Sequence, residues 1–211
     1  MADSYPADLL YRKEPVCPFE LKRLLWPDII FYNKQKAIIR SVQDNDETMV
    51  VAGNMLGKDY ICGFIALWFF LSRDPVHVVT TSVDFDQLRN VLWGEINSFI
   101  QHSKYPLTRE KGGPLVVNFL HVRKFIHGAI CPKSYLIGRT CERPAGMLGH
   151  HLDRTDGIPR CLYIADECSA IRDEIDDAAD RWAHRKLLVG NPFLCNNFFF
   201  RGIKGGDVVA A

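Results

Sequence analysis

The fold of this chain is decided by one stretch, Met49-Val50-Val51-Ala52-Gly53-Asn54-Met55-Leu56-Gly57-Lys58-Asp59-Tyr60. An apolar run ends in a glycine-bearing loop with a Gly-Lys pair, and the apolar run 61–71 that follows is long enough for a helix. A strand, a loop of backbone N–H groups, a lysine and a helix N-terminus together make a phosphate-binding P-loop. Residues 52–60 are therefore predicted to bind nucleotide, with Lys58 reaching the β- and γ-phosphates.

The loop departs twice from the G-x-x-x-x-G-K-[ST] pattern. Ala52 stands at the first glycine position, a mild change because a small residue suffices there. Asp59 replaces the serine or threonine that would contact Mg²⁺. A carboxylate can ligate Mg²⁺ directly, but its charge is tolerable beside a polyphosphate only when the metal is present. Asp59 is therefore a candidate metal ligand.

The bulk composition is that of a globular protein. The chain has 211 residues, 47% hydrophobic and 24% charged, with a net charge of +1, which predicts one α/β domain without a general affinity for acids. Seven scattered cysteines without a C-x-x-C pair indicate reduced thiols. With no apolar signal core, and no apolar run near the roughly 20 residues that span a bilayer, we expect an intracellular, membrane-free protein.

Apolar strands alternate with helical patterns along the chain. Strands are predicted at 48–52, 76–81, 135–137, 161–165 and 186–189, with a hairpin at 115–119 and 122–129. Helices are predicted at 19–25, 33–42, 58–72, 84–102 and 175–184. This order indicates a central, mostly parallel sheet flanked by helices on both faces. Residues 1–30 are expected to be a lead-in segment that packs on a domain formed by 31–211, in which 138–159 is a Gly- and Arg-rich loop.

A pair of acids follows the apolar strand 161–165. Asp166 and Glu167 match the Walker B arrangement, in which Asp166 would hold the metal and Glu167 would polarise the attacking water as general base. An exposed turn is the alternative for an isolated Asp-Glu pair. Because this pair follows a P-loop in the expected order, the catalytic interpretation is favoured.

Two further groups are candidates for ligand contact. The element Gly190-Asn191-Pro192 ends another apolar strand, where open α/β sheets bind ligands, so Asn191 is a candidate γ-phosphate sensor; a turn-forming role is the alternative. Gln35 has aromatic neighbours, and its amide suits the N6/N7 edge of adenine. A solvated helix residue is the alternative for Gln35.

In this order the motifs resemble the ATPase domain of the large terminase subunit of tailed double-stranded DNA bacteriophages. The similar segments cover most of the chain: 26–35 (adenine-reading), 49–60 (variable Walker A), 78–82 with Gln87, the arginine-bearing loop 138–150, 166–167 (Walker B), the coupling element 190–192, and 198–202.

The resemblance implies a P-loop NTPase of the ASCE type that uses ATP and Mg²⁺ to translocate double-stranded viral DNA into a procapsid. Its implied partners are the portal protein, the small terminase subunit and further copies of the chain in a ring, and its implied place is the host cytoplasm, transiently docked at the procapsid portal. A neighbouring subunit would supply an arginine to the active site. Arg139, preferred for its Gly138 neighbour and loop setting, and Arg143 are the candidates; a structural or solvated role is the alternative for each.

No acidic cluster remains for the two-metal nuclease site of full-length large terminases, so we expect ATPase and no nuclease activity. Two other interpretations stay open. A helicase-like ATPase would need a second RecA-like domain, and a non-hydrolysing DNA- or portal-binding module would have a lapsed P-loop.

Overall fold

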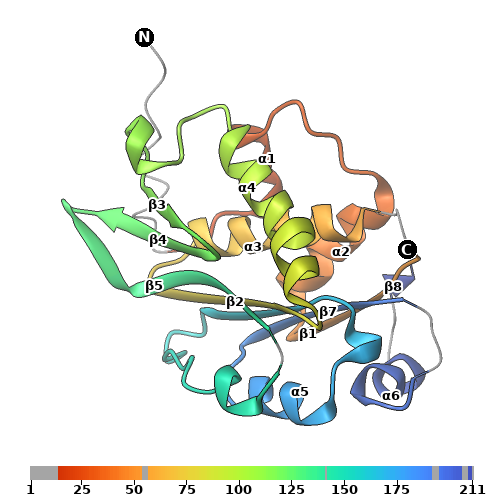
Figure 1. Ribbon diagram of the computed structural model, residues 1–211. Helices are drawn as coiled ribbons and strands as arrows, with labels where there is room; N and C mark the ends of the chain where they lie inside the picture. The colour runs from red at the N-terminus through yellow and green to blue at the C-terminus, as the bar shows by residue number, and fades with distance from the viewer. Residues whose placement is uncertain (1–13, 54–56, 141, 192–194, 206–208, 211) are drawn as a thin grey trace.

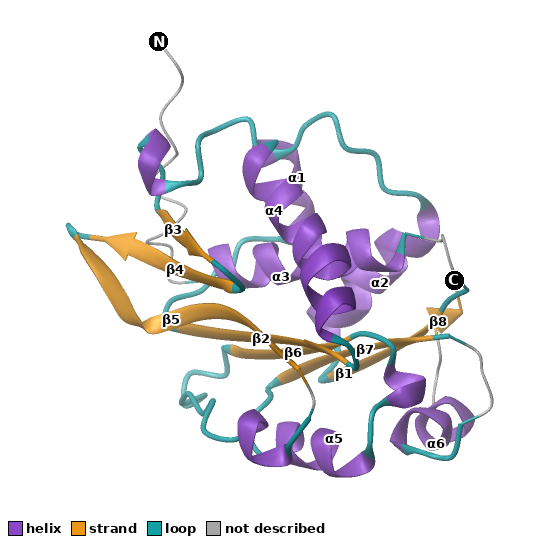
Figure 2. Ribbon diagram, viewed as in Figure 1, coloured by secondary structure: helices purple, strands orange, loops and turns teal. Residues whose placement is uncertain are grey.

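The computed structural model describes residues 14–53, 57–140, 142–191, 195–205 and 209–210. Over these residues the chain forms a sheet with helices on both faces (Figures 1 and 2). The strands lie in the order β3-β4-β5-β2-β6-β7-β1-β8. Their bounds are β1 (Glu47–Val51), β2 (Val76–Ser82), β3 (Leu115–Asn118), β4 (His121–Ile126), β5 (Ala129–Thr140), β6 (Cys161–Ala165), β7 (Arg185–Gly190) and β8 (Val209–Ala210).

In the order across the sheet, all neighbouring strands from β5 through β2, β6, β7 and β1 to β8 are parallel. Among the described strands, antiparallel pairing is confined to β3-β4-β5. Ala165 at the end of β6 pairs with Leu188, and Val51 at the end of β1 pairs with Gly190. The carboxyl ends of β1, β6 and β7 therefore open at one edge. Because β7 separates β1 from β6, the topology is that of an ASCE-type P-loop fold, as predicted.

The helices divide between the two faces of the sheet. Their bounds are α1 (Pro18–Leu25), α2 (Asn33–Asp44), α3 (Lys58–Leu71), α4 (Trp93–Gln101), α5 (Asp173–Asp180) and α6 (Phe198–Gly205). Helices α1 to α4 cover one face, and α5 and α6 cover the other (Figure 1). No helix in the described ranges is long and apolar enough to cross a membrane.

Strand β6 shows why both faces are covered. Leu162 and Ile164 pack with α1 to α4, whereas Tyr163 and Ala165 pack with α5 and Trp182. A strand buried on both sides reads as a continuous apolar run. Helix α3 is likewise buried along almost its whole length, which explains its unbroken apolar sequence.

Residues 14–30, the described part of the predicted lead-in segment, pack on the helical layer. Leu21 and Leu25 of α1 are buried in the core on that side of the sheet. The Trp26 indole N–H donates to the Phe99 carbonyl at 2.8 Å, which ties the segment to α4. These contacts make it part of the same core.

Four predicted elements differ from the structure. The hairpin strand expected at 122–129 ends at Ile126, and Ala129 begins β5. The helix expected at 84–102 begins as a π-helix, Gln87–Leu92, before α4, and the helix expected at 175–184 is α5, which ends at Asp180. Strand β5 extends to Thr140, so Gly138 and Arg139 are strand residues and not loop residues. The apolar pattern did not predict this extension, because it carries the polar residues Arg139 and Thr140 and is formed by pairing with Thr81 and Ser82 of β2.

A buried lysine joins α5 to the sheet. Lys186 of β7 donates to Asp176 at 2.8 Å and Asp180 at 2.7 Å, and lies 2.9 Å from a Glu47 carboxylate oxygen. Burial raises the pKa of Asp176 to about 6, against the opposing effect of Lys186. Asp176 thus depends on Lys186 for its charge to be tolerated inside the protein.

We predict that Lys186→Met lowers the free energy of unfolding by about 3 kcal/mol, because it leaves the Asp176 carboxylate buried without its cation. Urea denaturation measures the change. The double variant Lys186→Met/Asp176→Asn should recover much of the loss, and equal stability of the single and double variants would contradict the coupling.

Candidate nucleotide site

The predicted phosphate lysine lies at the first position of α3. Gly57 precedes it in the left-handed region, with φ +70°, and a glycine meets this conformation without strain. The Lys58 ammonium makes a hydrogen bond to Glu167 Oε1 and lies 3.4 Å from Asp166 Oδ1. Lys58 therefore bridges the P-loop end of α3 and the acids after β6.

Glu167 is held from a second side by Asn191. The Asn191 side-chain amide donates to Glu167 Oε2 at 3.0 Å. Glu167 itself has a left-handed backbone, with φ 56° and ψ 41°, which is uncommon for a non-glycine residue. The structure thus brings together the predicted lysine, general base and sensor from α3, β6 and β7.

Asp166 is buried at 1% exposure directly after β6. Its backbone N–H donates to the Thr81 carbonyl at 2.9 Å, and the Gln87 side-chain amide donates to Asp166 Oδ2 at 3.3 Å. The π-helix that begins at Gln87 provides this contact, and π-helical turns are frequent at functional sites. The sequence singled out Gln87 only within the family resemblance and did not show that it reaches Asp166.

Two buried oxygens in this cluster suit a divalent cation. Asp59 Oδ1 and Asp166 Oδ1 are buried and accept no hydrogen bond from the described residues. Within the described ranges, no three His, Cys, Asp or Glu side chains form a metal cage by themselves. Mg²⁺ does not need such a cage, because it is usually held by one or two carboxylates with substrate phosphates and water. The residues present therefore fit Mg²⁺.

The surroundings favour the charged form of Lys58 and the neutral form of Asp59. Burial acts to lower the pKa of Lys58, but the Glu167 hydrogen bond and the nearby carboxylates outweigh it and raise the pKa. The pKa of Asp59 is raised to about 7, because the carboxyl is partly buried and faces the Asp166 carboxylate. The lysine thus stays charged, while Asp59 resists ionisation without a further cation.

Gln35 and Tyr60 flank the P-loop from the helical layer. Gln35 is buried, its Oε1 accepts the Tyr32 backbone N–H at 3.4 Å, and its amide nitrogen lies against Gly57. The Tyr60 ring packs on Phe99 with ring centroids 4.7 Å apart. Gln35 is therefore beside the loop, whereas the Tyr60 side chain belongs to the aromatic core.

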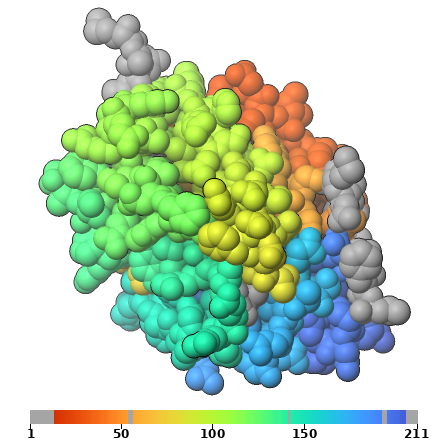
Figure 3. Space-filling view, in the orientation of Figure 1, coloured from red at the N-terminus to blue at the C-terminus, as the bar shows by residue number. Residues whose placement is uncertain are grey.

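The two candidate arginines lie outside this cluster. Arg139 and Arg143 are exposed and line a surface cavity of 390 Å³ together with Phe85 and Gly146. No described hydrogen bond or ion pair joins either arginine to the acids after β6. The Phe85 ring also lies against the Phe119 ring, with ring centroids 6.0 Å apart. The space-filling view accordingly shows the segment after β2 (yellow) beside the hairpin strands (green) (Figure 3).

Of the remaining predicted residues, Ala52 is buried beside the end of β1, and its N–H donates to the Gly190 carbonyl at 3.1 Å. Gly53 follows it. Asn54, Met55, Leu56 and Pro192 lie outside the described residues.

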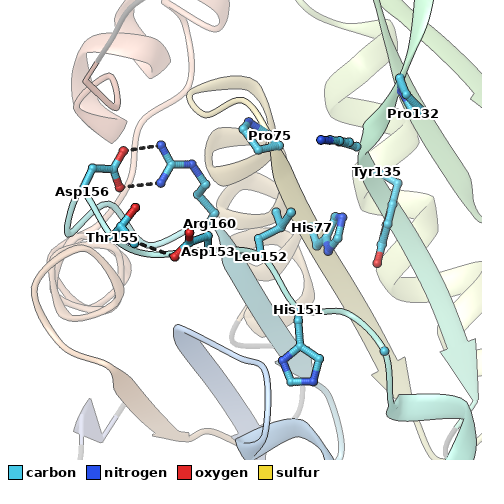
Figure 4. Close-up of a pocket in the computed structure, with 12 residues that line it drawn as sticks. Pro75, His77, Pro132, Tyr135, His151, Leu152, Asp153, Thr155, Asp156 and Arg160 are labelled. Atoms are coloured by element: carbon cyan, nitrogen blue, oxygen red, sulfur yellow. Dashed lines mark hydrogen bonds and ion pairs between the residues drawn. The ribbon is translucent and has the colours of Figure 1, made fainter.

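A larger cavity of 710 Å³ lies elsewhere, at the amino ends of β2 and β6. The stacked rings of His77 and Tyr135, 4.0 Å apart, line it, and Arg160 is paired with Asp156 on its opposite side (Figure 4). None of the predicted site residues lines it. Ligands of open α/β sheets bind at the carboxyl ends of the strands, which is where Lys58 and Glu167 meet.

The sequence matches no protein-family model and no curated protein. Solved structures do match. The large terminase ATPase domain of Thermus phage P74-26 has a TM-score of 0.64 and 19% identity, covering 93% of this chain and 78% of that one. A variant of that domain with one arginine changed to alanine has a TM-score of 0.63 and 19% identity, covering 89% and 74%.

The large terminase of another thermophilic bacteriophage, in complex with ADP, has a TM-score of 0.51 and 14% identity, covering 79% of this chain and 39% of that one. This chain has the fold of a large terminase ATPase domain. The predicted fold class is thereby confirmed, and the site described above lies at the carboxyl edge of the sheet of that terminase fold.

We predict that Asp59→Asn stabilises the nucleotide-free protein more at about pH 8 than at about pH 4. A carboxyl whose pKa is raised to about 7 in the folded protein binds its proton more tightly than in the unfolded chain. The contribution of Asp59 to the stability of the wild type therefore falls as the pH rises from about 4 through 7, and asparagine removes that fall.

Thermal unfolding without nucleotide or Mg²⁺ measures this difference. The exposed Asp28, replaced by asparagine, is the control. An Asp59→Asn effect of the same size at both pH values would show that the Asp59 carboxyl is not held against Asp166.

Proposed function

We propose that this chain is the ATP-hydrolysing motor domain of a viral DNA-packaging terminase, which couples hydrolysis to translocation of double-stranded DNA into the procapsid. The observation that carries the proposal is the arrangement of Lys58, Glu167 and Asn191 at the carboxyl edge of the sheet. The terminase-like fold supports it, because Lys58 begins the helix that follows β1, Asp166 and Glu167 follow β6, and Asn191 follows β7, at neighbouring positions along one edge of the sheet.

The residues divide the chemistry among them. Without nucleotide, Lys58 neutralises Glu167; phosphate oxygens compete for the ammonium, which frees the carboxylate. Glu167 is then placed to accept the proton of the attacking water, while Asn191 keeps the carboxylate oriented. Mg²⁺, held by Asp166 and Asp59, would neutralise charge on the phosphates.

The assembled motor is proposed to be a ring of this chain on the portal protein, loaded with DNA through the small terminase subunit in the host cytoplasm. Arg139 and Arg143 are exposed and unattached to the acids of their own subunit, which suits a group that acts on a neighbour's site. A cation beside the γ-phosphate stabilises charge in the transition state.

We predict that Glu167→Gln retains ATP binding and loses Mg²⁺-dependent hydrolysis by at least about 100-fold, since an amide cannot serve as general base. Lys58→Ala should weaken nucleotide binding as well. Phosphate release, with and without double-stranded DNA, and fluorescent-nucleotide titration measure the two effects.

The exposed residue Glu110 provides a carboxylate control: Glu110→Gln should hydrolyse ATP like the wild type. Full activity of Glu167→Gln would refute the catalytic assignment. A wild type that binds nucleotide without hydrolysing it, even with DNA and at high protein concentration, would favour the lapsed P-loop instead.

We predict that hydrolysis per subunit rises with protein concentration. Changing the arginine that acts on the neighbouring subunit, Arg139 or Arg143, to alanine should lower hydrolysis about 1,000-fold. Adding Glu167→Gln subunits, which keep both arginines, should partly restore hydrolysis by that arginine variant. Fast turnover independent of concentration would contradict a ring in which subunits complete each other's sites.

A further inference from the structure

A buried asparagine stands just before α6 and reaches the turn that follows Glu167. The Asn197 side chain donates from Nδ2 to the Cys168 carbonyl and to the Ile171 carbonyl, both at 2.7 Å. Its Oδ1 accepts the Phe200 backbone N–H at 3.4 Å, so the same amide also caps α6. Asn197 is 9% exposed.

The turn that Asn197 contacts follows Glu167 directly. Residues Cys168–Ala170 form a single 3₁₀ turn, in which the Ala170 N–H donates to the Glu167 carbonyl at 3.0 Å and the Ile171 N–H to the Cys168 carbonyl at 3.2 Å. A left-handed backbone at a non-glycine residue costs about 1 kcal/mol or more and persists only where its surroundings enforce it. The two bonds from Asn197 span this turn and supply such enforcement.

Helix α6 is itself fixed against the strand end that carries Asn191. Phe199 lies so close to Gly190 that a Cβ there would be 2.7 Å from its ring. The Phe198 N–H donates to Asp173 at 2.7 Å, and Arg201 pairs with the same carboxylate at 2.7 Å. The anchor of the turn therefore packs against Gly190 of β7 and is bonded to Asp173 of α5.

We infer that Asn197 is a positioning residue for Glu167: by bridging the Cys168 and Ile171 carbonyls it keeps the carboxylate in reach of Lys58 and Asn191 without itself touching nucleotide. The inference rests on the proposed function, because it assigns Asn197 a part in hydrolysis. If Asn197 only stabilised the fold, its substitution would lower the stability of the protein without lowering kcat more than nucleotide affinity.

The test compares Asn197→Ala with Asn196→Ala, a change at the exposed neighbour. Asn197→Ala should lower kcat by about tenfold or more while the ADP dissociation constant changes less than about threefold. Asn197→Asp keeps the size and the acceptor of the side chain but loses both N–H donors. It should show the same loss in kcat as Asn197→Ala. Asn196→Ala should match the wild type.

An activity-independent measurement separates this inference from the proposed function. Hydrogen exchange at the Ala170 and Ile171 amides should accelerate in Asn197→Ala and stay unchanged in Asn196→Ala, since those N–H groups close the turn. If the wild type does not hydrolyse ATP, the proposed function fails, and the exchange result still decides whether Asn197 holds the turn.

Unchanged exchange at both amides would overturn the inference, as would equal losses in kcat and nucleotide affinity. Should Asn197→Ala fail to fold, Asn197→Ser serves instead, because its hydroxyl can donate to one of the two carbonyls. It should then show a smaller but parallel loss in kcat and in amide protection.

Discussion

The pairing of Lys58 with the acids after β6 is the interaction on which the rest of the site depends. Its ammonium contacts Glu167 and Asp166 across the end of β7, so it holds the P-loop helix and the acid-bearing strand at one position. A charge buried this deeply is tolerated only with partners. Asn191 and Gln87 complete the arrangement by binding one oxygen of each acid.

The carboxyl groups around Lys58 outnumber the single positive charge of its ammonium group. Three carboxyl groups, of Asp59, Asp166 and Glu167, act on one ammonium. Burial and this excess together raise the pKa of Asp59, and one buried oxygen each of Asp59 and Asp166 accepts no hydrogen bond from the described residues. A divalent cation with its phosphates would relieve both, so the unusual Asp59 fits a metal-dependent site better than a lapsed one.

The positions of several candidate site residues could be predicted because their signals are local. Gly57 and Lys58 lie at a loop-to-helix junction, and Asp166 and Asn191 each follow a buried strand, so a parallel sheet must bring them to one edge. Arg139 could not be placed this way, because the polar end of β5 is a strand only through its pairing with β2, which lies far away in the sequence. The contact of Gln87 with Asp166 and the role of Asn197 could not be predicted for another reason: an amide on a π-helical turn or before a short helix has no sequence pattern of its own.

The sequence by itself thus determined the fold class and the order of the chemical groups, since strand periodicity and the P-loop spacing are properties of neighbouring residues. Only the tertiary structure decided which groups touch: that Lys58 binds Glu167 directly, that Asp59 faces Asp166, and that Asn197 spans the turn after Glu167. These contacts join residues far apart in the chain. Their geometry depends on strand register and on how the helices pack against the sheet, and their charges depend on the desolvation that burial imposes. A local sequence pattern contains none of this information.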